Sequence, residues 1–134
     1  MFQISAKTDY GLLIMITLAR QADSITPLSP LARKLKLSSS YLSQIATLLQ
    51  KAKLIKSKEG VGGGYYLARL ADKISVLEIL EALSGKMKVR CAHGEAKACP
   101  HFKQCSLKNA WPVLLDDIKN SLANRSLASL IVNK

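Results

Sequence analysis

Acidic side chains are scarce in this sequence. The 134 residues hold nine Asp and Glu against twenty Lys and Arg, which gives a formal net charge of +11. No acid falls between Asp23 and Glu59, whereas seven bases do: Arg33, Lys34, Lys36, Lys51, Lys53, Lys56 and Lys58. A local excess of positive charge attracts a polyanion, and nucleic acid is a better candidate for that partner than an anionic membrane surface.

Long apolar runs are also missing. No stretch approaches the ~18–20 apolar residues that a membrane span requires. Lys7 precedes an apolar run at 12–19, as in a signal segment, but Asp9 interrupts the approach, Arg20 ends the run and no small-residue cleavage site follows. We therefore expect a cytoplasmic protein with no membrane partner. Because 49% of the residues are apolar, one compact domain of this length can bury a core.

Signatures of catalysis and of disulfide scaffolds are absent as well. The chain has no HExxH motif, no nucleophile elbow and no pair of acids in a segment with regular periodicity. These absences argue against an enzyme such as a small metal-dependent hydrolase, and we expect no small-molecule substrate. There are only three cysteines, an odd number, so a disulfide framework is improbable in a reducing compartment and a bound metal is favoured.

The first half of the chain has the pattern of a helix-turn-helix. Helical spacing of apolar residues predicts a helix over 5–22, and a short extended piece follows at 26–28. Ser29 as N-cap and Pro30 at the first helical position predict a helix through Lys36. Ser38 is expected to cap the next helix, to about residue 51, which turns Leu42, Ile45, Leu48 and Leu49 inward. Two short helices joined by a tight turn are typical of this motif.

A β-hairpin is predicted directly after these helices. Residues 54–59 alternate between apolar and polar, residues 60–64 are rich in glycine, and residues 65–67 read as a returning strand. A hairpin in this position favours a wing. The predicted fold class is therefore mainly α with a small β-wing, a winged helix-turn-helix, with residues 1–73 forming the DNA-binding domain.

Residues 74–134 are predicted to combine a cysteine loop with a long helix. Ser75 and Glu78 have the spacing of a capping box, and Val76, Leu77, Leu80 and Leu83 are expected to line the buried face of that helix. The regular pattern is lost over about 85–108, and a loop of that length is more often functional than idle. A second apolar stripe follows: Trp111, Leu114, Leu115, Ile118 and Leu122. This stripe is expected to pack on its own domain or to form a dimer interface. Pro112 is expected to start or kink the helix that carries it, and Ser126 to cap a short terminal helix.

The helix that begins after Ser38 carries the candidate DNA-reading residues. The first turn of such a helix enters the major groove, where Ser38, Ser40, Tyr41 and Gln44 suit phosphate and base-edge contacts. Ser38 is equally explained as a cap, and Tyr41 can also be explained by packing. Four residues of the wing are expected to contact the flanking DNA backbone: Lys56, Lys58, Gly62 and Gly63.

The cysteines are candidate ligands of an iron–sulfur cluster. Seven residues separate Cys91 from Cys99, and five separate Cys99 from Cys105. Neither gap fits the short paired spacing of zinc knuckles, whereas ligands of an iron–sulfur cluster tolerate wider spacing. A zinc site and a thiol redox switch stay open as alternatives. His93 and His101 lie in the same loop and could complete a metal site, although plain solvation explains them better.

Several motifs together resemble the IscR/NsrR-type family of winged-helix regulators, also called Rrf-type. The matching residues span most of the chain: Thr8-Asp9-Tyr10, Ser40-Tyr41-Leu42 with Gln44-Ile45, the GxGGGYxLA segment from Gly60, the three cysteines and Trp111. The resemblance implies a homodimer that binds operator DNA as a repressor or activator. It further implies a 2Fe–2S or 4Fe–4S cluster on Cys91, Cys99 and Cys105 that controls operator affinity, with the C-terminal segment closest to the branch that regulates the SUF cluster-assembly operon.

The chain departs from this family at several positions. The first cysteine gap is longer than usual, and Lys108 stands where related cluster regulators have a ligating histidine. The resemblance makes Asp9 a candidate fourth ligand, because nitric-oxide sensors of the family use an N-terminal aspartate that the other protomer supplies. His93, His101 or an exogenous group are the alternative ligands, and Asp9 is equally explained as an acid that helps to cap the first helix. Glu59 stands where relatives often insert an arginine into the minor groove, so either Lys58 replaces that arginine or the wing docks differently.

Overall fold

The computed structural model describes residues 4–88, 100–101 and 103–131. The helices of the described chain are α1 (Ala6–Arg20), α2 (Ser29–Leu35), α3 (Ser39–Lys51), a 3-10 turn η1 (Ala71–Lys73), α4 (Val76–Ser84), α5 (Leu107–Ala123) and α6 (Leu127–Ile131). Strands β1 (Ile55–Lys58) and β2 (Gly64–Leu67) form an antiparallel pair. The predicted mainly helical fold with a small β-wing is confirmed. None of the helices in these ranges is both long and apolar enough to cross a membrane.

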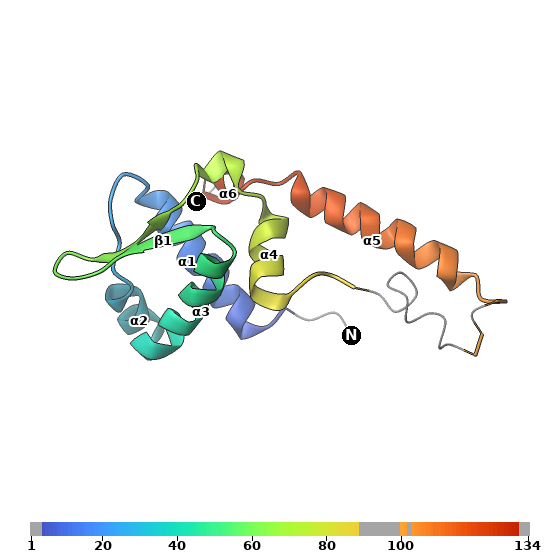
Figure 1. Cartoon of the computed structure of the whole chain (residues 1–134), viewed down its shortest axis with the longest axis horizontal. Coiled ribbons are helices and arrows are strands. Elements are labelled where there is room, and N and C mark those ends of the chain that lie inside the picture. The colour runs from blue at the N-terminus through green and yellow to red at the C-terminus, as the bar shows by residue number, and fades with distance from the viewer. Residues whose placement is uncertain (1–3, 89–99, 102, 132–134) are drawn as a thin grey trace.

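One hydrophobic core joins the two halves of the sequence. Helix α1 packs against α3, α4 and α6, and Figure 1 shows α1 at the centre of this body with α5 extending away from it. Ile14 and Met15 of α1 are fully buried, as are Leu42 of α3 and Leu127 of α6. Because α6 returns to α1 and η1, residues near the C-terminus contribute to the same core as the helix-turn-helix.

Hydroxyl side chains begin most of the helices. The Ser38 Oγ accepts a hydrogen bond from the Tyr41 N–H at 3.0 Å, and Ser126 Oγ accepts one from the Ser129 N–H, so both predicted caps are confirmed. The predicted cap at Ser29 is wrong. The chain is already helical at Leu28, whose carbonyl accepts the first helical bond from Ala32, so Ser29 and Pro30 lie inside the first turn.

The predicted capping box opens α4. The Glu78 N–H donates to Ser75 Oγ, and the Ser75 N–H donates to Glu78 Oε2 at 2.9 Å. Burial acts to raise the pKa of Glu78, but the Ser75 bond and the Arg69 guanidinium, 2.8 Å from Oε1, outweigh it and the pKa is lowered. A carboxyl with a lowered pKa stabilises the fold at neutral pH, and this contribution is lost as the pH falls through that pKa.

The apolar faces of the later helices differ from the sequence pattern. In α4 the buried residues are Val76, Ile79 and Leu83, so the prediction omitted Ile79, while Leu77 and Leu80 are only partly buried. In α5 only Leu115 is buried. Pro112 lies inside α5 and does not start it, because the helix begins at Leu107. The direction from which neighbouring helices approach decides which apolar positions are covered.

A third segment anchors the wing to the helical body. Register in the pair places Ile55 opposite Leu67 and Lys56 opposite Tyr66. On the other edge of β2, Tyr65 exchanges two backbone hydrogen bonds with Thr26, of 2.8 and 2.9 Å. The extended piece predicted for 26–28 therefore forms a bridge at Thr26, but it does not reach Leu28, which is already helical. Gly64 allows this approach, because a Cβ there would lie 2.5 Å from the backbone of Thr26.

We predict that Gly64→Ala destabilises the protein by about 3 kcal/mol, since the added methyl group meets backbone atoms that cannot move without breaking the Thr26 bridge. Gly60→Ala is the matched control: its Cβ has open space and only the left-handed backbone (φ +90°) is unfavourable, for about 1–2 kcal/mol. Urea denaturation followed by circular dichroism measures both. Equal losses would show that the close approach to Thr26 is not needed.

Candidate DNA-binding interface

A tight turn between α2 and α3 sets the angle of the second helix. Helix α2 ends at Lys36, which adopts a left-handed conformation (φ 57°) and donates its N–H to the carbonyls of Ala32 and Arg33. The Leu37 N–H also donates to the Ala32 carbonyl, at 2.9 Å, and Ser38 then caps α3. A short turn of this kind joins the helices of a helix-turn-helix.

The outward stripe of α3 consists of small polar side chains and one base. The helix buries Leu42, Ile45, Ala46 and Leu49 on one side. Its exposed residues fall on the other side at helical spacing: Ser39, Ser40, Ser43, Gln44, Thr47 and Lys51. Hydroxyl and amide groups donate and accept hydrogen bonds, as base edges and phosphates require, and no acid interrupts the stripe.

The predicted reading residues are not equivalent in the structure. Ser40 and Gln44 are exposed on this stripe. Ser38 is exposed but its Oγ already serves as the cap acceptor. Tyr41 is half-buried, and its ring meets Tyr10 of α1 edge-on, with centroids 6.0 Å apart and planes at 85°. Packing therefore occupies part of the Tyr41 ring, and its remaining surface faces solvent.

The seven bases of the acid-free segment are all exposed. They lie on α2, on the turn after it, at the end of α3 and on the wing, around the polar stripe of α3. Within the described ranges, Lys56 and Lys58 form no ion pair, so both ammonium groups are available to phosphates. A positive surface with no paired acid is what a phosphate backbone requires.

The tip of the wing is a glycine turn. The Gly63 N–H donates to the Gly60 carbonyl at 3.0 Å, which closes the turn, and Gly62 occupies its third position with φ +75°. That position of a type II turn needs a positive φ, which glycine adopts without steric cost. At Gly63 a side chain would collide with the carbonyl oxygen of Lys58, so this glycine is needed for the turn itself.

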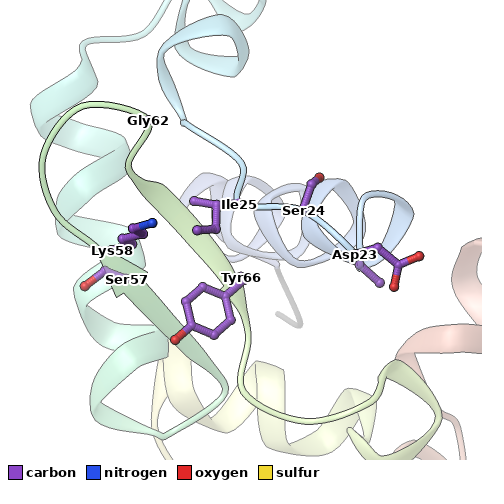
Figure 2. Close-up of a pocket in the computed structure, with 8 residues that line it drawn as sticks. Asp23, Ser24, Ile25, Ser57, Lys58, Gly62 and Tyr66 are labelled. Atoms are coloured by element: carbon purple, nitrogen blue, oxygen red, sulfur yellow. The ribbon is translucent and has the colours of Figure 1, made fainter.

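A shallow groove lies between the wing and the segment that follows α1. Figure 2 shows Lys58 of the wing to the left of Ile25, with Tyr66 of the wing below Ile25 and Gly62 at the turn above them. Asp23 lines the far end of the groove, away from Lys58 in this view.

Sequence analysis missed a contact that connects the reading helix to the wing. Gln50, in the last turn of α3, donates from Nε2 to Ser57 Oγ of β1 at 2.9 Å. It also missed Thr47, which extends the exposed stripe one turn beyond Gln44. The spacing of Thr47 from Ser43 was a usable signal, whereas no local pattern pairs Gln50 with Ser57.

The candidate metal ligands are only partly described by the structure. Cys91, Cys99 and His93 lie outside the described residues. Cys105 is half-buried and in no disulfide, and His101 is exposed.

Asp9 is exposed in the first turn of α1, where Ser5 Oγ accepts the capping bond from the Thr8 N–H. In the described ranges the Asp9 carboxylate accepts no hydrogen bond, so it does not cap α1 directly, but a negative charge in the first turn still interacts favourably with the helix dipole.

This arrangement defines the class of protein. An outward polar helix behind a tight turn, a basic surround and a glycine-tipped hairpin make a winged-helix DNA-binding protein.

Comparison with known proteins assigns the family. The sequence profile of Rrf2, described as an iron-dependent transcriptional regulator, matches residues 4–133, and the chain belongs to this family. The regulator IscR of Aliivibrio salmonicida is 30% identical over 132 residues, which cover 98% of this chain and 78% of that protein.

Two solved structures are similar over nearly the whole chain. CymR (YrzC), the global cysteine regulator of B. subtilis, is 32% identical with a TM-score of 0.74, covering 98% of this chain and 97% of that one. IscR of T. potens is 30% identical with a TM-score of 0.74, covering 97% and 86%. These relatives are named as transcriptional regulators and not as enzymes, and this protein is a DNA-binding transcriptional regulator.

Proposed function

We propose that the protein is a cytoplasmic, homodimeric regulator that senses through an iron–sulfur cluster, and that the cluster state sets its operator affinity. Cys91, Cys99 and Cys105 would hold the cluster, as 2Fe–2S or 4Fe–4S. The description of the family as iron-dependent and the similarity to IscR support this proposal. The likeness to CymR of Staphylococcus aureus, whose structure is also known in an oxidized form, makes a thiol redox switch the second candidate.

Operator recognition is assigned to α3 and the wing. Ser40 and Gln44 would contact base edges, because they are exposed on the polar stripe of α3. Ser38 and Tyr41 would contact phosphate beside them. Lys56, Lys58 and the backbone at Gly62 and Gly63 would contact the flanking phosphates, since the two ammonium groups are exposed and unpaired within the described chain.

We predict that Gln44→Ala costs about 1–3 kcal/mol at the operator and relaxes selectivity at one base position. Lys56→Ala, by contrast, is expected to weaken binding to every sequence and to reduce the steepness of the salt dependence. Fluorescence anisotropy on operator and random duplexes at several salt concentrations separates the two effects. An equal loss on both duplexes for Gln44→Ala would remove its reading role.

The dimer is assigned to the exposed face of α5. Leu115 packs toward the body and is 7% exposed, whereas the large apolar side chains beside it are uncovered: Leu107, Trp111, Leu114 and Ile118. These four recur at spacings of four, three and four residues and so form one stripe along the helix. A second copy of the chain carries the same stripe, so a two-fold pairing of α5 helices would bury both.

The position of the cysteine segment also points to two protomers. Figure 1 shows the beginning of α5 at one end of the long axis, well separated from the beginning of α1 in the body. Cys105 lies just before α5, and Asp9 lies in the first turn of α1. Because these two ends of the body lie apart, the Asp9 and Cys105 that bind one cluster would come from different protomers in this proposal. This separation is the observation that carries the proposal of a shared sensor.

The donor set suits such a cluster. Thiolates are its usual ligands, and Cys105 offers a half-buried thiol in no disulfide. A carboxylate is a harder ligand than a thiolate, so an iron held by Asp9 would be the more labile one. When bound, the cluster supplies an iron centre whose oxidation or loss is the signal.

A direct packing contact connects this sensor to the DNA-reading helix. Tyr10 follows Asp9 in α1, and its ring packs edge-on against Tyr41 in the first turn of α3. Release of Asp9 from a ligand would allow the start of α1 to shift, and Tyr10 would transmit the shift to α3. Two aromatic rings in contact transmit displacement because packed interiors resist compression.

We predict that a negative charge on the α5 stripe separates the protomers without unfolding them. Trp111→Glu should weaken dimerisation by about 2–4 kcal/mol, roughly 30- to 1,000-fold, because a buried aromatic contact is replaced by a charge. Val113→Glu is the matched control, since Val113 is 60% exposed on a different face of α5. Light scattering after gel filtration reports the mass. A Trp111→Glu variant that stays dimeric at micromolar concentration would contradict the assignment.

For the sensor, we predict that anaerobically purified protein contains iron and acid-labile sulfide and absorbs visible light, and that Cys105→Ser loses most of this absorption. Asp9→Ala should keep the helical content but change the visible spectrum and speed cluster loss in air, because one iron loses its ligand. His101→Ala is the control for a nearby alternative ligand. A colourless protein that contains zinc would contradict the cluster and support a structural zinc site. A metal-free protein whose thiols oxidise reversibly would instead support the redox switch.

A further inference from the structure

The wing presents a single apolar side chain at its tip. Val61 is 105% exposed, the largest exposed fraction among the large apolar residues of the described chain. Its neighbours Gly60, Gly62 and Gly63 have no side chains, so the valine projects alone. An isolated exposed valine contributes nothing to the core, and the hydrophobic effect favours covering it.

The turn holds Val61 in place. The bond from the Gly63 N–H to the Gly60 carbonyl closes the turn around it, and the wing is tied to the body through Tyr65 and Thr26. Valine has few accessible χ1 rotamers, because it is branched at Cβ. A rigid, narrow tip therefore loses little conformational entropy when it enters a groove.

The charge at the tip is unusual for a wing on DNA. From Glu59 to Tyr66 the sequence has one acid and no base, and Glu59 is exposed. The nearest bases, Lys58 and Lys56, stand on β1 behind the tip. A narrow minor groove over an A-tract has an enhanced negative potential that attracts basic side chains. Such a groove would repel the carboxylate of Glu59.

We propose that the wing enters the minor groove through Val61, which makes apolar contact with the deoxyribose walls, and that it selects a groove wider than that of an A-tract. This proposal rests on the proposed assignment of α3 and the wing to operator DNA. Apolar side chains enter minor grooves in other DNA-binding proteins, and groove width is read without base-specific hydrogen bonds. Lys58 then contacts the adjacent phosphate. The carboxylate of Glu59, beside it, disfavours binding to the narrow minor groove of an A-tract.

The test uses the full chain purified without oxygen. Wild-type protein first selects duplexes from a random library, and the best one is prepared in two forms. These forms differ only in the flank under the wing: an A-tract, or a mixed sequence of average groove width. Affinities are measured by fluorescence anisotropy for wild type, Val61→Ser, Glu59→Arg and Leu70→Ser. Leu70 is the matched control, because it is 71% exposed and lies outside the wing.

We expect wild type to prefer the mixed flank, and Val61→Ser to lose about three- to tenfold in affinity for it, from the apolar area left uncovered. Glu59→Arg should reverse the flank preference, and Leu70→Ser should bind as wild type does. Wild-type affinity of Val61→Ser on both duplexes, or a preference of wild type for the A-tract, would overturn the inference but leave the reading role of α3 intact. If the wild-type protein selects no duplex, the minor-groove role of Val61 and the assignment of α3 and the wing to operator DNA are both contradicted.

Discussion

The buried side of α3 packs on α1 through Leu42, Ile45 and Leu49, each exposed by 1% or less. Complete burial of a side chain of this size contributes about 1.5–3 kcal/mol, so the rotation of α3 about its axis is strongly determined. Since one side of the helix is held inward, the hydroxyl and amide stripe on the other side must face outward. The outward stripe of α3, to which DNA reading is assigned in the proposal, therefore depends on apolar contacts on the opposite side of the helix.

The wing depends on the same body through contacts that are distant in sequence. Thr26, in the segment between α1 and α2, joins the outer edge of β2, and Gln50 of α3 bonds Ser57 of β1, so both strands are tied to the helical body. At the end of β2, Arg69 pairs with Glu78 of α4 and donates to the Lys73 carbonyl. The hairpin and the reading helix are thus positioned as one unit, which a protein that contacts adjacent DNA grooves needs.

Helix α5 belongs to this body on one face only. It contacts α4, and its Leu115 is buried, while the stripe that includes Trp111 and Ile118 stays uncovered. An amphipathic helix in a complete globule hides its apolar face, so an exposed stripe of this length indicates a partner surface. The proposed partner is a second copy of the chain, and in that proposal one association would build both the dimer interface and the shared sensor.

The amino-acid sequence by itself determined the local features of this protein. The cap at Ser38, the capping box of Ser75 and Glu78, the glycine turn and the polar stripe of α3 follow from residues within about one turn of each other, and all were predicted. Only the tertiary structure decided that Ile79 is buried while Leu77 and Leu80 are partly exposed, that Leu28 and not Ser29 is the N-cap of α2, and that Tyr10 meets Tyr41. Those outcomes depend on the direction from which distant segments approach, and local propensity carries no information about that direction.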